Sequence, residues 1–187
     1  MTFSVTAFSQ LSQIESYKSK LSGLKGKKKL ELYKTFTNEL SQESPLLSQK
    51  FVREALQEAI AQNETVYQIE FYRKLGEIKH ELSEYDSSSV YYKKAVDLAV
   101  STNNEREIYK SRIKMATVYL YNKEYKKGKE VLSDCAQKAI KNSDDESAGL
   151  AYSNLANFHR QTGDLDSAIF YQKRAIDYQK KSEDLSH

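Results

Sequence analysis

Proline, glycine and cysteine are scarce in this sequence. One Pro and six Gly among 187 residues exclude collagen-like and proline-rich chains, and they argue against an all-β fold with many tight turns. A single Cys rules out an intramolecular disulfide framework and a metal site built from several cysteines. The three His residues lie far apart in the chain, which argues against a histidine metal site. We therefore expect no bound metal and no cofactor.

Long apolar runs are also absent. No stretch of about 18 apolar residues exists, so we expect no transmembrane helix. The first residues, MTFSVTAFSQLSQ, lack the basic and the long apolar regions of a signal peptide, so the expected location is the cytoplasm, although a removed leader or an excised fragment stays open. Twenty-nine basic residues against 26 acidic ones give a net charge of +3, which neither requires nor excludes a nucleic-acid partner.

Three segments of the sequence align without gaps. They are YRKLGEIKHELSEYDSSSVYYKKAV, RIKMATVYLYNKEYKKGKEVLSDCA and YSNLANFHRQTGDLDSAIFYQKRAI, which begin at residues 72, 112 and 152, each 40 residues after the last. Some matching columns hold large apolar residues and others hold small ones. A large column contains Leu75, Met115 and Leu155, and a small column contains Ser88, Gly128 and Ala168. Small side chains let neighbouring helices approach closely, so the columns indicate packed helices.

The apolar spacing within each segment is helical. Leu75, Ile78 and Leu82 fall on one face of a first helix, and a short polar break at residues 83–84 separates it from a second helix. Each unit is therefore predicted to be a helical hairpin with a tight turn. A single hairpin would leave an apolar face in water, and stacking would bury that face.

The connections between hairpins are predicted to be longer and to carry helix-start signals. Two residue pairs have the spacing of a capping box: Thr102 with Glu105, and Ser143 with Glu146. Ser44 and Pro45 suit an N-cap and a first helical position.

These segments resemble the tetratricopeptide repeat. The best copy places Tyr152, Leu155, Ala156, Gly163, Ala168, Tyr171 and Ala175 in the expected columns of that family. The middle copy departs from the pattern at Arg112 and Gly128, and a period of 40 is similar to the longer-helix variety found in kinesin light chains and in bacterial peptide-sensing and sensor-kinase proteins. The resemblance implies an all-α, right-handed superhelical solenoid of eight or nine helices arranged as antiparallel pairs.

The same phase extends into the first third of the chain. Phe51, Val52 and Ala55 stand 40 residues before similar residues of the next unit, and a preceding helix is expected at 30–40. A capping helix with Phe8 and Leu11 on its apolar face is expected to end near Ser22 and Gly23, and the basic run 26–29 is interpreted as a solvated connection rather than a site for an anionic partner. We divide the chain into residues 1–62 and 63–187, the latter with repeats at 64–102, 103–142 and 143–182, in one continuous solenoid.

Signatures of catalysis are missing from the sequence. It has no glycine-rich phosphate loop and no His-Glu-x-x-His pattern, and the acids of NSDDESAG suit a helix start better than a calcium loop. Cys135 occupies an Ala column and is predicted to be a buried thiol, while His159 is interpreted as a packing replacement for Tyr. The chain is thus not expected to be an enzyme. Its 14 Tyr mostly follow helical stripes, so we favour a core role over a nucleic-acid stacking platform.

The resemblance implies a concave face lined by the first helix of each hairpin. Its candidate contact residues for a peptide or partner protein are Arg73, Glu77, His80, Lys110, Lys114, Thr117, Tyr121, Asn154, Asn157, Arg160 and Gln161. Asn amides donate and accept together, so Asn154 and Asn157 suit an extended peptide backbone, although a polar exposed helix face explains them as well. The family's clamp for a C-terminal carboxylate is not matched, because Glu77 replaces an Asn and Leu150 a Lys.

Two functions from different classes follow. The first is a non-enzymatic scaffold that binds a peptide or partner protein of mixed charge in the concave groove. The second is an N-terminal sensory or regulatory module of a larger signalling protein, such as a sensor kinase or a transcription regulator. Apolar residues spread around the last helix, Phe170, Tyr171, Ile176 and Tyr178, also suggest that the chain continues or self-associates through this helix.

Overall fold

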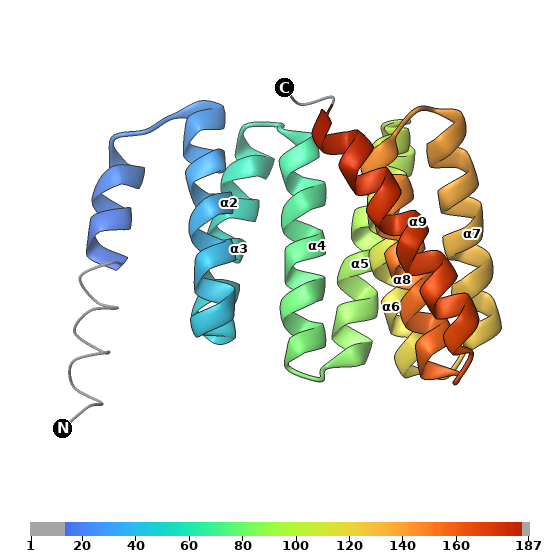
Figure 1. The fold of residues 1–187 in the computed structure, drawn as a ribbon. Coiled ribbons are helices and arrows are strands. Elements are labelled where there is room, and N and C mark those ends of the chain that lie inside the picture. The colour runs from blue at the N-terminus through green and yellow to red at the C-terminus, as the bar shows by residue number, and fades with distance from the viewer. Residues whose placement is uncertain (1–13, 185–187) are drawn as a thin grey trace. The chain divides into compact units, whose positions relative to one another are not determined.

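Every regular element in the computed structural model, which describes residues 14–184, is a helix (Figure 1). Residues 14–22 form a helix, which ends near Ser22 and Gly23 as the sequence predicts. Phe8 and Leu11 of the expected capping helix lie outside the described residues. The other helices are α2 (Gly26–Glu43), α3 (Pro45–Ala61), α4 (Thr65–Glu81), α5 (Tyr85–Ser101), α6 (Glu105–Tyr121), α7 (Tyr125–Lys141), α8 (Asp145–Gln161) and α9 (Leu165–Asp184). The expectation of an all-α fold is confirmed.

The turns from α3 onwards repeat every 20 residues. Each contains one residue with a positive φ, at Asn63, Ser83, Asn103, Lys123, Ser143 and Gly163. The amide of that residue donates to the carbonyl three residues back, and the next amide donates to the carbonyl five residues back, as in Asn103 N to Val100 O at 3.1 Å and Asn104 N to Ala99 O at 3.2 Å. This is the Schellman ending of a helix, formed mostly without glycine.

The predicted difference between turns and longer connections is wrong. Every link from α3 to α9 has three residues, whether it lies within a hairpin or between two hairpins. The predicted capping boxes are wrong for the same reason, because the helices begin later than expected. Asn104 and Asp144 are the caps, and their side chains accept from the amides of Glu107 and Ser147 at 3.2 and 3.1 Å. Ser143 instead has the positive φ that ends α7.

The chain forms two compact units, residues up to Phe71 and residues from Tyr72 onwards, and the division falls within α4. In the first unit Phe36 of α2 packs edge-on against Phe51 of α3 at 4.9 Å, and both rings are buried. The predicted connection at 26–29 is wrong, since these residues form the first turn of α2. Lys29 there pairs with Glu58 of α3 at 2.7 Å, so part of the basic run is used inside this unit.

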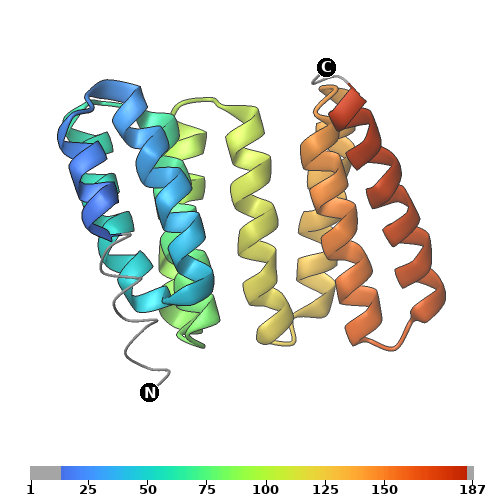
Figure 2. The same ribbon diagram turned by 60° about the vertical axis from the view of Figure 1, so that its left-hand side comes forward.

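In the second unit consecutive helices run antiparallel and pack in chain order (Figures 1 and 2). Small residues lie where helices cross. A Cβ placed on Gly76 of α4 would lie 2.6 Å from two ring carbons of Tyr92 in α5, and one placed on Gly128 of α7 would overlap the ring of Phe158 in α8. Ser88 donates to the carbonyl of Gly76 at 2.8 Å. The small column read from the sequence is therefore a column of close helix contacts.

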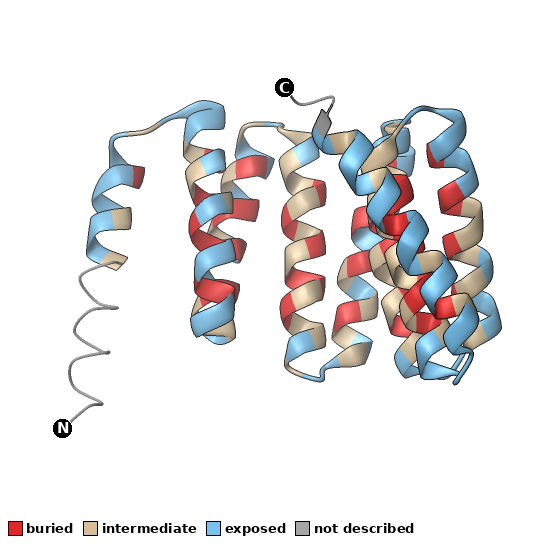
Figure 3. Ribbon diagram, viewed as in Figure 1, coloured by how far each residue is buried: buried red, intermediate tan, exposed pale blue. Residues whose placement is uncertain are grey.

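Burial follows the same pattern. Figure 3 shows buried residues in red along α4 to α8, whereas α9 is mostly exposed, and its buried residues among those described are Ala168 and Ala175. None of the helices within residues 14–184 has both the length and the hydrophobicity of a membrane span.

Candidate functional site

The predicted contact residues come from α4, α6 and α8 of the second unit. Arg73, predicted as a contact residue of the concave face, is 9 % exposed and forms an ion pair with Glu107 of α6. Its Nη1 also donates to Ser111 Oγ at 3.3 Å. Because Glu107 is buried as well, the pair links two helices and offers little to a ligand.

Two further predicted cations are used in the same way. Lys114 Nζ of α6 lies 2.6 Å from Glu77 Oε1 of α4, and Lys110 Nζ of α6 lies 2.7 Å from Glu146 Oε1 of α8. Glu146 also pairs with Arg106, and these basic partners hold the pKa of its carboxyl below the ordinary value against the opposing effect of burial. The charges at these positions thus join successive first helices of the hairpins.

Aromatic rings gather at one end of α4 and α6. His80 meets Tyr121 edge-on at 4.4 Å, and Tyr121 stacks on Tyr85 of α5 at 4.5 Å. The Nε2 atom of His80 has no hydrogen-bond partner among the described residues. Burial and the nearby Lys114 lower the pKa of His80, with Glu77 acting in the opposite direction. Tyr121 is 48 % exposed and forms the open side of this cluster.

The predicted residues of α8 lie together at a cavity. Asn154, Asn157 and Arg160 line a space of about 620 Å³ whose opposite wall is α9. Arg160 Nη2 donates to Asn157 Oδ1 at 2.8 Å, and Asn154 Nδ2 donates to Leu150 O of its own helix at 2.9 Å. Of the remaining predicted residues, Gln161 is exposed at the end of α8, and Thr117 of α6 donates to the carbonyl of Lys114 at 2.7 Å.

The α9 wall contains apolar residues that the sequence analysis did not select. Leu165 and Ile169 line the cavity and are 61 % and 56 % exposed. Phe170 and Ile176, which the sequence did select, are also exposed. Tyr171 and Tyr178 are not part of this surface, because both rings stack on Tyr152 of α8, at 6.0 and 5.6 Å.

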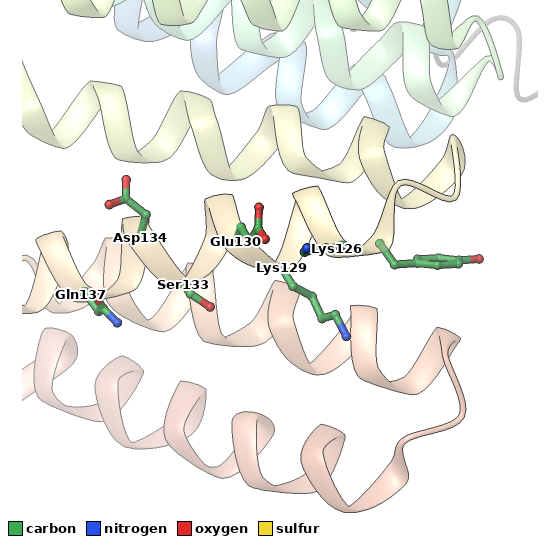
Figure 4. A pocket seen from close by; sticks show the side chains of 7 residues that line it. Lys126, Lys129, Glu130, Ser133, Asp134 and Gln137 are labelled. Atoms are coloured by element: carbon green, nitrogen blue, oxygen red, sulfur yellow. The ribbon is translucent and has the colours of Figure 1, made fainter.

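A second hollow, of about 730 Å³, lies along α7, and the sequence analysis did not identify it (Figure 4). Its lining residues are Tyr125, Lys126, Lys129, Glu130, Ser133, Asp134 and Gln137. All of them belong to one helix, so no second element closes over the space. It is a polar surface depression with no converging set of groups from different helices.

Groups with catalytic or metal-binding potential are few in the described part of the chain. Cys135 is 1 % exposed, and burial raises the pKa of its thiol to about 11, so the thiolate is strongly disfavoured. Residues 14–184 contain no cluster of three or more His, Cys, Asp or Glu side chains arranged to hold a metal ion. His159 packs on Tyr171 at 5.2 Å, in agreement with its predicted packing role.

The comparison with protein families identifies two segments. The family model described as Tetratricopeptide repeat matches residues 69–99 and 150–182, which fall on the first and third predicted repeats. A comparison with curated protein sequences gives no match.

Solved structures share the fold at low sequence identity. BtubC from P. vanneervenii aligns with a TM-score of 0.66 and 14 % identity, over 82 % of this chain and 63 % of its own. Aspartyl phosphate phosphatase F from Bacillus subtilis aligns with a TM-score of 0.74 and 17 % identity, over 93 % and 47 %. A Rap protein in complex with Competence and Sporulation Factor gives 0.61 and 17 %, over 94 % and 56 %. This chain therefore spans less than two thirds of each of these proteins.

Proposed function

The chain is a tetratricopeptide-repeat protein, and from this premise we propose that it is a non-enzymatic scaffold that binds a peptide or a partner protein. The binding surface is the α4, α6 and α8 side of the second unit, with α8 as its main element. Within residues 14–184 the structure consists of helical repeats, without a separate catalytic domain.

One observation carries the proposal: the cavity lined by Asn154, Asn157 and Arg160. The predicted charges on α4 and α6 are held in ion pairs, and a ligand would have to break these pairs to use them. The two Asn side chains are half-buried, and the described residues leave part of their donor and acceptor capacity open to a ligand. Half-buried amides beside an apolar wall can recognise a backbone while apolar contacts supply affinity.

The test is co-purification from the native source with the wild type and with the double variant Asn154→Ala/Asn157→Ala. A partner that contacts these amides loses about 1–3 kcal/mol of binding free energy for each unsatisfied group, so it is lost from the variant. The matched control is Ser133→Ala/Gln137→Ala, which removes two polar side chains from the α7 depression. Recovery of the same partner by all three proteins would place binding elsewhere and refute this site.

The second candidate is a sensory or regulatory module of a larger signalling protein. Its support is the fold shared with aspartyl phosphate phosphatase F and with a Rap protein complexed with Competence and Sporulation Factor. This function requires the helical array to change conformation when the ligand binds. Hydrogen exchange of the whole chain with and without the recovered partner separates the two functions. Protection confined to α8 and α9 supports a plain scaffold, and altered exchange in α2 to α5 supports a sensory module.

A further inference from the structure

The cavity between α8 and α9 has two unlike walls. Its α8 wall is polar, with Asn154, Asn157 and Arg160, and its α9 wall exposes Leu165 and Ile169. Exposed large apolar side chains next to each other lower their free energy when another apolar surface covers them. A ligand with an apolar stripe would therefore be stabilised in this cavity by covering Leu165 and Ile169.

The preceding hairpin shows what kind of element covers an equivalent surface. Gly128 of α7 stands 40 residues before Ala168 of α9, and Gly128 is covered by the ring of Phe158 from helix α8. Phe158 is 1 % exposed, so the crossing is fully packed. In this molecule the surface of one hairpin is thus closed by a helix that brings a large apolar side chain onto the small-residue column.

The composition of α9 departs from its repeat where the surface is open. The position of Ile169 is Lys129 in α7 and Ser89 in α5, so both earlier copies carry a polar residue there. Those copies belong to hairpins followed by another helix of the chain. The apolar residue occurs on the hairpin whose groove no described residue fills.

The charge of the cavity selects one class of occupant. None of its nine described lining residues is acidic, and Arg160 is the charged one. Arg73 and Lys110, in contrast, each meet a carboxylate from the first helix of the next hairpin, Glu107 of α6 and Glu146 of α8. The Arg160 guanidinium instead donates to the neutral amide of Asn157. A helix that lies over this groove and brings a carboxylate to Arg160 therefore matches the charge of the lining.

We propose that the groove between α8 and α9 binds an amphipathic, acidic α-helix of a partner protein, which docks as α8 docks on α6 and α7. This rests on the proposed scaffold function and narrows its partner from any peptide to a helix. A second copy of the groove is a poorer occupant, because two grooves face to face would bring Arg160 against Arg160 with no carboxylate in either lining.

The probe is a synthetic 17-residue helix with a side-chain staple. It copies Ala148, Ala151, Leu155 and Phe158 at their α8 positions and carries Glu at the remaining exposed positions. A stapled peptide of the same composition in scrambled order is the control. Fluorescence anisotropy with the full chain measures both dissociation constants. We expect the helix to bind at least tenfold more tightly than the scrambled peptide.

Variants of the chain locate the binding. Ile169→Asp is expected to weaken the helix at least tenfold, and Arg160→Ala to weaken it severalfold and to reduce its salt dependence. Val90→Asp is the matched control, because Val90 is 53 % exposed on α5 and lies outside the cavity, so it leaves affinity unchanged. Since Ile169 is exposed, thermal unfolding is expected to be the same for Ile169→Asp and the control.

Several results would overturn the inference. They are equal binding of the helix and the scrambled peptide, no binding up to about 1 mM, and an affinity that Ile169→Asp leaves unchanged. Sedimentation showing a wild-type dimer that Ile169→Asp dissociates would assign the groove to a second copy instead. If a native partner is retained by Ile169→Asp but lost from Asn154→Ala/Asn157→Ala, the scaffold function stands and the helical partner is wrong.

Discussion

Adding one methyl group at Gly76 is expected to destabilise the second unit, although Ala favours a helix more than Gly does. The new Cβ of Gly76→Ala would lie 2.6 Å from two ring carbons of Tyr92, which is 2 % exposed. Carbon atoms prefer a separation of about 3.5–4.0 Å, so the ring or the helix must move by roughly 1 Å. Overpacking of this kind costs about 1–3 kcal/mol, and the helix propensity of Ala returns about 1 kcal/mol. We expect a net loss of up to about 2 kcal/mol.

Gly149→Ala is the matched control for Gly76→Ala. Gly149 lies inside α8, and a Cβ there would have its nearest neighbours at 3.4 Å, an ordinary contact, so the variant is expected to gain up to about 1 kcal/mol. Urea unfolding followed by circular dichroism measures both changes. Opposite signs support the packing argument. Equal changes in both variants, or stabilisation by Gly76→Ala, would refute the argument that Gly76 marks a close contact between α4 and α5.

Three other predictions concern charged and reactive groups of the second unit. Arg73→Ala is expected to lower the free energy of unfolding in urea by about 3–5 kcal/mol, because Glu107 stays buried without its partner. The double variant Arg73→Met/Glu107→Leu is expected to recover most of this loss. Equal stability of the two variants would contradict the account. The pKa of His80 is lower in the folded chain than in the unfolded one, so the unfolded chain binds more protons just below the ordinary His pKa of about 6.5. The free energy of unfolding is therefore expected to fall as the pH drops through that value. If this pH dependence persists unchanged in His80→Phe, His80 is not its source. Cys135, with its pKa raised to about 11, is expected to react with a disulfide reagent only as fast as the chain unfolds, and rapid labelling of the native protein would show that the thiol is accessible.

The 40-residue period was sufficient to predict hairpins, but not the links between them. The turns rely on Asn103, Lys123 and Ser143 with positive φ, a conformation that glycine signals far more clearly. Because these positions lack glycine, the sequence predicted longer connections between hairpins. It also placed the helix caps one or two residues before Asn104 and Asp144, which are the caps in the structure. The signal that was missed is the regular spacing of four short polar residues at helix ends, in steps of 20 or 40 residues: Asn63, Ser83, Asn103 and Ser143.

The contact residues of the concave face were predicted one position at a time. In the structure, the charged ones of α4 and α6 form ion pairs with residues of other helices. Arg73 occupies a column that the family resemblance assigns to the concave face, but it is buried in an ion pair with Glu107 of the next hairpin. Such a pairing depends on the relative height of two helices, which the period alone does not give. The apolar wall was missed because aromatic residues drew attention to Tyr171 and Tyr178, which stack on Tyr152. A comparison of Ile169 with its polar equivalents in the earlier repeats would have indicated it.

The most direct test of the partner-binding surface is photo-crosslinking from inside it. Gln172 lines the cavity between α8 and α9, while Gln137 lies in the α7 depression, and each is replaced in turn by p-benzoylphenylalanine. After irradiation in the native source, mass spectrometry identifies the crosslinked protein. We predict one partner crosslinked from position 172, absent from position 137, and lost when Asn154→Ala/Asn157→Ala is added. The same partners from both positions, or crosslinks that this double variant leaves unchanged, would contradict a binding site at α8 and α9.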